Sequence, residues 1–118
     1  MQKKSVLICD DDEDILEVCK VILSEDYDVK TVSQCENILQ EIENTNPDIV
    51  LMDVLMPGSG KEAIRAIKEN EETAHLPVIL FSAMDDLEKI KENVHATAII
   101  QKPFSIELFK KTLEKHIL

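Results

Sequence analysis

The chain has 118 residues, 44% of them hydrophobic and 31% charged, and a formal net charge of −11. This length and composition suit one soluble globular domain over residues 1–118, and the negative charge would repel nucleic acid or an anionic membrane as a direct partner. No apolar run approaches the ~20 residues of a membrane span and the N-terminus has no signal-peptide segment, so a cytoplasmic protein is expected.

In chain order, five short apolar runs have the length and composition of buried strands. They are residues 5–9, 27–32, 49–53, 78–83 and 97–101. In the second run, Val29 and Val32 are expected to point inward. These runs are continuously apolar rather than alternating, which is typical of parallel strands covered on both faces.

Each apolar run is followed by a segment with apolar residues at helical spacing. The expected inward residues are Ile15, Cys19, Ile22 and Leu23 in the first segment, Cys35, Ile38, Leu39 and Ile42 in the second, and Gly60, Ala63, Ile64 and Ile67 in the third. The fourth has Leu87, Ile90 and Val94, and the last has Ile106, Phe109 and Leu113 after a capping Ser105. Five strand–helix units predict an α/β fold, a doubly wound five-stranded parallel sheet.

Polar side chains follow four of the predicted strands. Asp10, Asp11 and Asp12 follow the first, and Asp53 ends the third. Ser82 lies near the end of the fourth strand, and Lys102 follows the fifth. In such a sheet, ligands bind at the carboxyl ends of the strands. Carboxylates gathered there would repel one another without a cation, and hard oxygen ligands suit Mg²⁺.

Taken singly, each of these residues has a simpler explanation. Asp12 fits a helix N-cap, Ser82 a turn hydroxyl and Lys102 a solvated surface charge. A calcium loop starting at Asp10 is excluded, because its sixth and twelfth positions would be Ile15 and Val21 instead of glycine and glutamate. The three cysteines form no CxxC pair, which argues against a disulfide framework or a zinc site. The occurrence of these acidic, hydroxyl and lysine residues together at successive strand ends favours one functional site.

Four ordered motifs, VLICDDDEDI, IVLMDVLMP, PVILFSA and QKPF, cover the length of the chain. Together they resemble the receiver domain of two-component response regulators. The resemblance implies the flavodoxin-like strand order 2-1-3-4-5. It also implies phosphorelay signalling, in which a sensor histidine kinase or phosphotransfer protein donates a phosphoryl group and a downstream protein or effector domain responds. Such a domain is regulatory rather than an enzyme acting on a separate substrate.

The resemblance assigns a role to each matching residue. Asp53 is implied to be the phosphoacceptor, with Mg²⁺ held by Asp10, Asp11, Asp53 and the backbone carbonyl of Leu55. Ser82 is implied to donate a hydrogen bond to the phosphoryl group, and Lys102 to pair with its charge. Pro57 shapes the loop after the acceptor, and the Lys102–Pro103 peptide is expected to be cis. These roles agree with phosphoryl transfer, which depends on positioning and charge neutralisation more than on a base.

Three positions depart from the family pattern. Ile99 replaces the aromatic residue usual three positions before the lysine, GSG (58–60) replaces a glycine pair with two residues between, and His95 replaces a glycine. The family resemblance also implies that two side chains flank the water that hydrolyses the phosphoaspartate. One lies two residues after the acceptor and is Leu55 here, and the other lies two residues after the hydroxyl residue and is Met84. These departures concern signal relay and signal lifetime rather than the acceptor.

Three other functions share parts of this pattern. A flavodoxin would need a hydroxyl- and glycine-rich loop after the first strand, where the aspartates would repel a phosphate. A haloacid-type phosphatase would need an acid at Leu55. A phosphorylation-independent interaction module on the same scaffold is favoured by Ile99 but disfavoured by the intact set of acidic, hydroxyl and lysine side chains.

Overall fold

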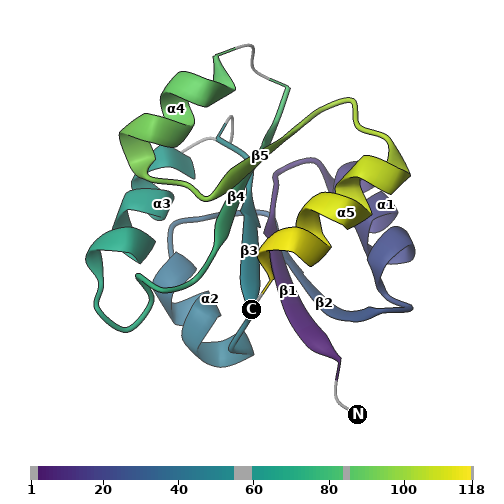
Figure 1. Ribbon diagram of the computed structural model, residues 1–118. Coiled ribbons are helices and arrows are strands. Elements are labelled where there is room, and N and C mark those ends of the chain that lie inside the picture. The colour runs from purple at the N-terminus through teal and green to yellow at the C-terminus, as the bar shows by residue number, and fades with distance from the viewer. Residues whose placement is uncertain (1–2, 55–59, 84–85, 118) are drawn as a thin grey trace.

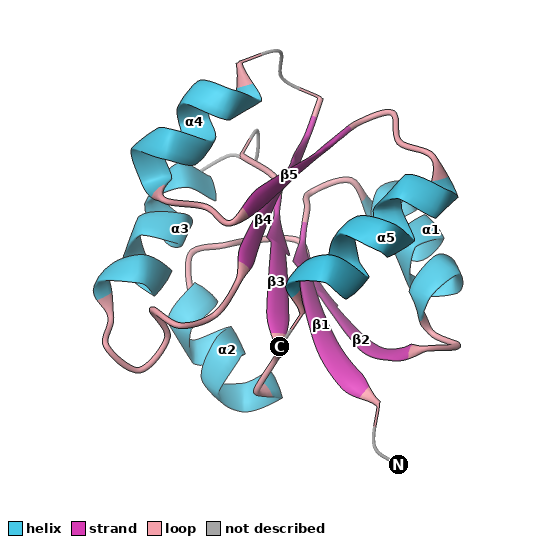
Figure 2. Ribbon diagram, in the orientation of Figure 1, coloured by secondary structure: helices cyan, strands magenta, loops and turns pink. Residues whose placement is uncertain are grey.

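The structure is a computed structural model that describes residues 3–54, 60–83 and 86–117. Its elements follow one another in strict alternation (Figure 2). They are β1 (Lys4–Cys9), α1 (Glu13–Leu23), β2 (Tyr27–Val32), α2 (Ile38–Thr45), β3 (Ile49–Met52), α3 (Gly60–Glu69), β4 (Val78–Ser82), α4 (Leu87–Val94), β5 (Ala98–Gln101) and α5 (Ile106–His116).

The described strands form one parallel sheet in the order β2-β1-β3-β4-β5. This confirms the predicted fold class and strand order. Helices α1 and α5 cover one face of the sheet, and α2, α3 and α4 cover the other (Figure 1). The order reverses between β1 and β3, which are paired with each other, so the carboxyl ends of these two strands open onto the crevice where such folds bind ligands.

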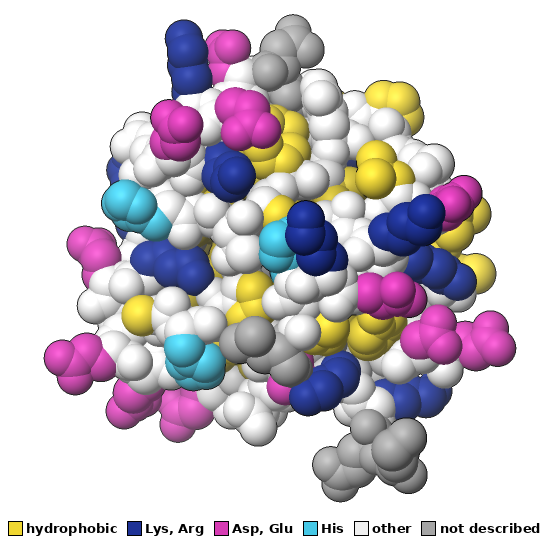
Figure 3. All heavy atoms as spheres, viewed as in Figure 1, with side chains coloured by type: hydrophobic (Ala, Val, Ile, Leu, Met, Phe, Trp, Pro, Cys, Tyr) yellow, Lys and Arg dark blue, Asp and Glu magenta, His cyan; other side chains and the backbone are white. Residues whose placement is uncertain are grey.

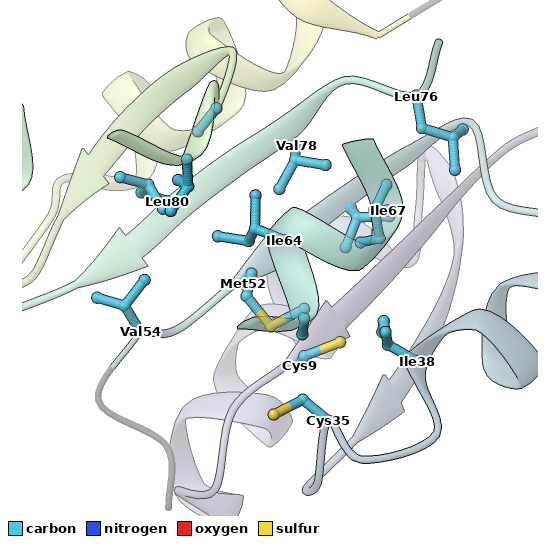
Figure 4. Packing of buried hydrophobic residues seen from close by; sticks show 14 of the residues in the cluster. Cys9, Cys35, Ile38, Met52, Val54, Ile64, Ile67, Leu76, Val78 and Leu80 are labelled. Carbon is cyan, nitrogen blue, oxygen red and sulfur yellow. The ribbon is translucent and has the colours of Figure 1, made fainter. Parts of the chain in front are cut away.

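Two hydrophobic clusters lie on opposite faces of the sheet. Along β1, Val6 and Ile8 belong to the cluster under α1 and α5, whereas Leu7 and Cys9 belong to the cluster under α2, α3 and α4. All four side chains have 0% exposure. Figure 4 shows part of the second cluster, in which side chains of β1, β3 and β4 pack with α3. Because side chains alternate across a strand, burial on both faces explains the continuous apolar runs of β1, β3 and β4. The edge strand β2 differs from the prediction, since half-buried and exposed residues alternate along most of it.

Side chains cap the helices that frame the site. Asp12 accepts hydrogen bonds from the backbone N–H groups of Asp14 (3.0 Å) and Ile15 (3.3 Å) at the start of α1. Ser105 accepts one from Leu108 N–H (3.0 Å) at the start of α5, as the sequence predicts. These caps satisfy donors that the first turn leaves free and fix where each helix begins.

One predicted inward residue is placed differently, and the buried stripe of α1 is shifted from the expected one. This stripe consists of Leu16, Cys19 and Leu23, while Ile15 and Ile22 are half-buried and pack against the same cluster. Ile106 was expected to face inward on α5 but is 56% exposed. Helix α1 carries apolar residues around most of its circumference, so spacing alone does not identify the face that meets the sheet. The apolar residues left over lie on the surface between α1 and α5.

Two helices end on residues in the left-handed region of backbone conformation. Asn46 closes α2 with φ of 47°, and His95 closes α4 with φ of 61°. Asparagine tolerates this conformation, whereas histidine stands where glycine is favoured. Among the described residues, no helix combines the length and apolar character needed to cross a membrane.

Candidate functional site

Two carboxylates lie side by side at the carboxyl edge of the sheet. Asp10 follows β1 and Asp53 follows β3, and the Asp53 backbone N–H donates to the Cys9 carbonyl oxygen at 3.0 Å. This bond continues the ladder between the two central strands by one step. Asp10 has 0% exposure and Asp53 has 4%. Buried carboxylates are costly unless they are paired, so a cationic partner is required nearby.

That partner is Lys102, which comes from the far end of the chain. Its Nζ lies 2.5 Å from Asp10 Oδ2 and 3.2 Å from Asp53 Oδ2, and its side chain is 15% exposed. The Lys102 backbone N–H donates to the Ser82 carbonyl oxygen at 2.8 Å, which ties the loop after β5 to the end of β4. The Lys102–Pro103 peptide is cis, as the family resemblance implies.

Burial and charge act in opposite directions on these groups. Burial raises the pKa of Asp10 above its ordinary value, although the hydrogen bond from Lys102 opposes this shift. Burial alone would lower the pKa of Lys102, but the hydrogen bond and charge of Asp10, together with those of Asp53, raise it. The lysine is therefore held firmly in its charged form beside both carboxylates.

Asp11 brings a third carboxylate to the same place. Single carboxylate oxygens of Asp10, Asp11 and Asp53 lie within 4.8 Å of one another, and Asp11 is exposed to solvent. Three carboxylates and one ammonium carry a formal charge of −2 when ionised. A compact set of hard oxygen donors with one solvent-facing member fits a small divalent cation that keeps some of its waters. We call Asp10, Asp11, Asp53 and Lys102 the acidic site.

Ser82 is the last residue of β4 and has 0% exposure. It stands beside Gln101 in the register of β4 with β5, one residue before Lys102. The structure thus brings Asp10, Asp11, Asp53 and Lys102 together and places Ser82 at the same edge of the sheet. Leu55, Pro57 and Met84 lie outside the described residues. Asp12 serves as the cap of α1, and its backbone N–H donates to Asp10 Oδ1 at 3.0 Å.

Gly60 lies against the backbone of Asp53, a contact that its place in the sequence did not predict. A Cβ atom at this first residue of α3 would lie 2.3 Å from the Asp53 carbonyl oxygen and 2.9 Å from the Val54 Cα. Both distances are far below van der Waals contact. The start of α3 therefore rests directly on the backbone of Asp53, and only glycine allows that approach. In the sequence, Gly60 ends the GSG run (58–60), whose glycine spacing departs from the family pattern.

The family model described as response regulator receiver domain matches residues 6–114. The chain is a member of this family. It is 36% identical over 107 residues to the chemotaxis protein CheY of Halobacterium salinarum, and the match covers 86% of each protein. Receiver domains are regulatory domains of two-component signalling, and their interactions with histidine kinases and downstream effectors define their role.

Longer proteins and solved structures show the same relationship. The receiver is 31% identical over 116 residues to a probable cyclic di-GMP phosphodiesterase of Vibrio cholerae, of which it spans only 26%. The structure of the chemotaxis response regulator CheY4 of Vibrio cholerae superimposes with a TM-score of 0.89, at 26% identity, covering 98% of this chain and 100% of that one. The fold and its strand order are thus shared with chemotaxis regulators.

Proposed function

We propose that this receiver accepts a phosphoryl group on Asp53 from a histidine kinase or a histidine phosphotransfer protein. The observation that carries the proposal is the pairing of the Asp53 carboxylate with Lys102 at 3.2 Å, beside the carboxylates of Asp10 and Asp11. An ionised carboxylate is a competent nucleophile at neutral pH without a general base. It attacks phosphorus as the bond to the histidine nitrogen breaks, and the imidazole leaves with that electron pair.

Each neighbouring side chain has a distinct part in this reaction. Lys102 neutralises charge on the transferred oxygens, and the Ser82 hydroxyl donates a hydrogen bond to one of them. Asp10, Asp11 and Asp53, with the carbonyl of Leu55, would hold Mg²⁺. When bound, this ion supplies positive charge that stabilises the phosphoryl oxygens. Without it the net negative charge of the acidic site would repel an incoming phosphate.

Intact-protein mass spectrometry tests the proposal. Incubation with acetyl phosphate and Mg²⁺ should add the mass of one phosphoryl group, and a chelator should prevent the addition. Asp53→Asn, which keeps the shape of the side chain but removes its negative charge, should not be labelled. Labelling of this variant at the wild-type yield would show that another residue is the acceptor.

An apolar groove beside the acidic site supports docking of the donor. Ile15, Val18 and Ile22 of α1 line one side, and Pro103, Phe104 and Ile106 line the other, next to Lys102. Val18 is 48% exposed and Ile106 56%, so both side chains are accessible to a partner at the groove. Figure 3 shows hydrophobic side chains at the surface on the side where α1 and the start of α5 lie. We name this surface the α1–α5 groove.

The chemistry of the groove favours one occupant, a helix of the histidine-bearing donor. Its apolar lining suits a helix with aliphatic side chains, and Glu13, Asp14 and Glu17 of α1 favour basic residues at the rim of that helix. A histidine on such a helix would lie close to Asp53, because the groove shares Lys102 with the acidic site. The groove therefore accounts for both binding and placement of the donor.

Two matched variants on α5 test this docking. Ile106 and Leu108 are equally exposed at 56%, but only Ile106 lines the groove. Ile106→Asp should slow phosphotransfer from an autophosphorylated histidine kinase that labels the wild type, and should leave labelling by acetyl phosphate unchanged. Leu108→Asp should affect neither reaction. Equal effects of the two variants on transfer from the kinase would contradict docking at the groove.

The output of phosphorylation should reach α4 more strongly than β5. Ile99 is half-buried on β5 and packs against the cluster under α4. An isoleucine side chain has no polar tip, so it cannot alternate between a buried and an exposed position as the usual aromatic residue does. We expect the Ser82 hydroxyl and the segment after it to shift α4. Amide exchange with and without a beryllofluoride mimic of the phosphate measures this; equally large changes in β5 would argue against it.

A further inference from the structure

The ring of Phe81 lies under the ammonium group of Lys102. The Lys102 Nζ is 4.7 Å from the centre of the ring, within the distance at which a cation is attracted to an aromatic face. Phe81 immediately precedes Ser82 in β4 and has 0% exposure. Because the ring is fully buried, this attraction is screened less than it would be at the protein surface.

Two further aromatic rings fix the orientation of Phe81. Its centroid lies 5.8 Å from that of Phe109, with 12° between the ring planes, and 5.4 Å from that of Phe104. Phe104 and Phe109 also contact each other, with centroids 4.7 Å apart. A ring held on these sides cannot turn its edge toward the lysine without displacing its neighbours. The face presented to Lys102 is thus a fixed part of the structure.

We propose that Phe81 is a positioning residue for phosphoryl transfer and that its ring face holds the Lys102 ammonium beside Asp53. The part of this proposal that concerns transfer rests on the function proposed above. The ring–ammonium contact itself does not, because it involves only Phe81 and Lys102.

The reason such a support matters is the mobility of a lysine side chain. Four methylene groups join the ammonium to the backbone, and the 15% exposure of the side chain leaves a path toward solvent. Of its two anionic partners, Asp53 changes charge and shape when it is phosphorylated, whereas the Phe81 ring stays the same throughout. The ring therefore restrains the lysine during the step in which Asp53 changes.

A purely structural role for Phe81 has to be separated from this one. Phe81→Leu would create a cavity in the core under either explanation, so loss of stability cannot distinguish them. Fluorination can, because successive fluorines on the ring withdraw electron density from its face while changing its volume little. Phe109 is a matched control, because it belongs to the same aromatic cluster and the ammonium contact described in the structure is with Phe81.

The first measurement needs neither a phosphodonor nor a metal ion. Protons above the face of an aromatic ring are shielded, so the ε-methylene protons of Lys102 should resonate upfield of those of the other lysines in the NMR spectrum. Phe81→Leu should return them to the ordinary lysine position. Ordinary shifts in the wild-type protein would overturn the contact, and with it the proposal.

The second measurement follows the rate of phosphorylation by acetyl phosphate. Site-specific incorporation of 4-fluoro-, 3,5-difluoro- and 3,4,5-trifluorophenylalanine at position 81 should lower the rate stepwise, by about three- to tenfold in total. The same series at position 109 should leave it unchanged, with urea unfolding confirming that each protein is folded. No loss at position 81, or equal losses at both positions, would overturn the proposal. Failure of the wild type to be labelled at all would instead refute the proposed function, while the NMR measurement would still test the contact.

Discussion

Replacing Gly60 by alanine should weaken both the stability of the receiver and its proposed reaction. In most helices this change is favourable by roughly 0.5–1 kcal/mol, because glycine loses more backbone freedom on folding. Here the new Cβ would lie 2.3 Å from the Asp53 carbonyl oxygen and 2.9 Å from the Val54 Cα. Both are backbone atoms, which cannot rotate away as a side chain can.

The start of α3 also has little freedom to retreat. Val54 and Ile64 belong to the same buried cluster, with 8% and 0% exposure, so core packing fixes α3 to the segment after β3 (Figure 4). Inserting a methylene group into a packed core costs about 1–3 kcal/mol. After the gain in helix propensity is subtracted, we expect a net loss of about 1 kcal/mol in the free energy of unfolding, and at most about 2.5 kcal/mol.

The effect on phosphorylation should be larger than the effect on stability. Relief of the clash moves the Asp53 backbone, and a displacement of about 1 Å in a reacting group can cost about 100-fold in rate. Urea unfolding and the rate of labelling by acetyl phosphate measure the two effects. Glu69→Ala, at the exposed C-terminal residue of α3, is the control and should change neither. If Gly60→Ala were more stable than the wild type and equally fast, the close approach to Asp53 would be refuted.

Three further predictions follow from other features. Asp11→Asn should stabilise the metal-free protein, because it relieves repulsion among the carboxylates. Mg²⁺ at ten times its Kd should add about 1.4 kcal/mol to the free energy of unfolding of the wild type and nothing to that of the variant. Thermal melts in which Mg²⁺ stabilises both proteins would contradict this. His95→Gly should raise the free energy of unfolding by about 1 kcal/mol, because the φ of 61° is strained for histidine. Asn46→Gly should raise it by less. Urea unfolding measures both, and the reverse order would be inconsistent with backbone strain at His95. Leu55 and Met84 carry no group that orients a hydrolytic water. Leu55→Asn combined with Met84→Ser should therefore speed loss of phosphate by about tenfold. If the decay after removal of the donor is unchanged, these two positions do not control hydrolysis.

The acidic site was predictable because it depends on topology. Once the apolar runs are interpreted as parallel strands, the residues that follow them must meet at one edge, whatever the details of packing. Asp10, Asp53 and Lys102 are separated widely in the sequence and yet form ion pairs in the structure. Their positions follow from where each strand ends, which the sequence marks clearly.

The remaining features depend on distances that spacing does not encode. Leu16 rather than Ile15 faces the sheet because the orientation of α1 is decided by how its whole surface packs, not by its own periodicity. Ile106 is exposed because α5 meets the sheet through Phe109 and Leu113. The approach of Gly60 to Asp53 is likewise a contact between elements, and appears only in the folded chain.

The identity of the acceptor is the central claim, and reduction of the labelled protein tests it most directly. Borohydride converts a phosphorylated aspartate into homoserine, which peptide sequencing by mass spectrometry then locates. After labelling with acetyl phosphate and Mg²⁺, homoserine should be found at position 53, with unmodified aspartate at positions 10 and 11. Homoserine at Asp10 or Asp11, or an equal yield from Asp53→Asn, would contradict the assignment of Asp53.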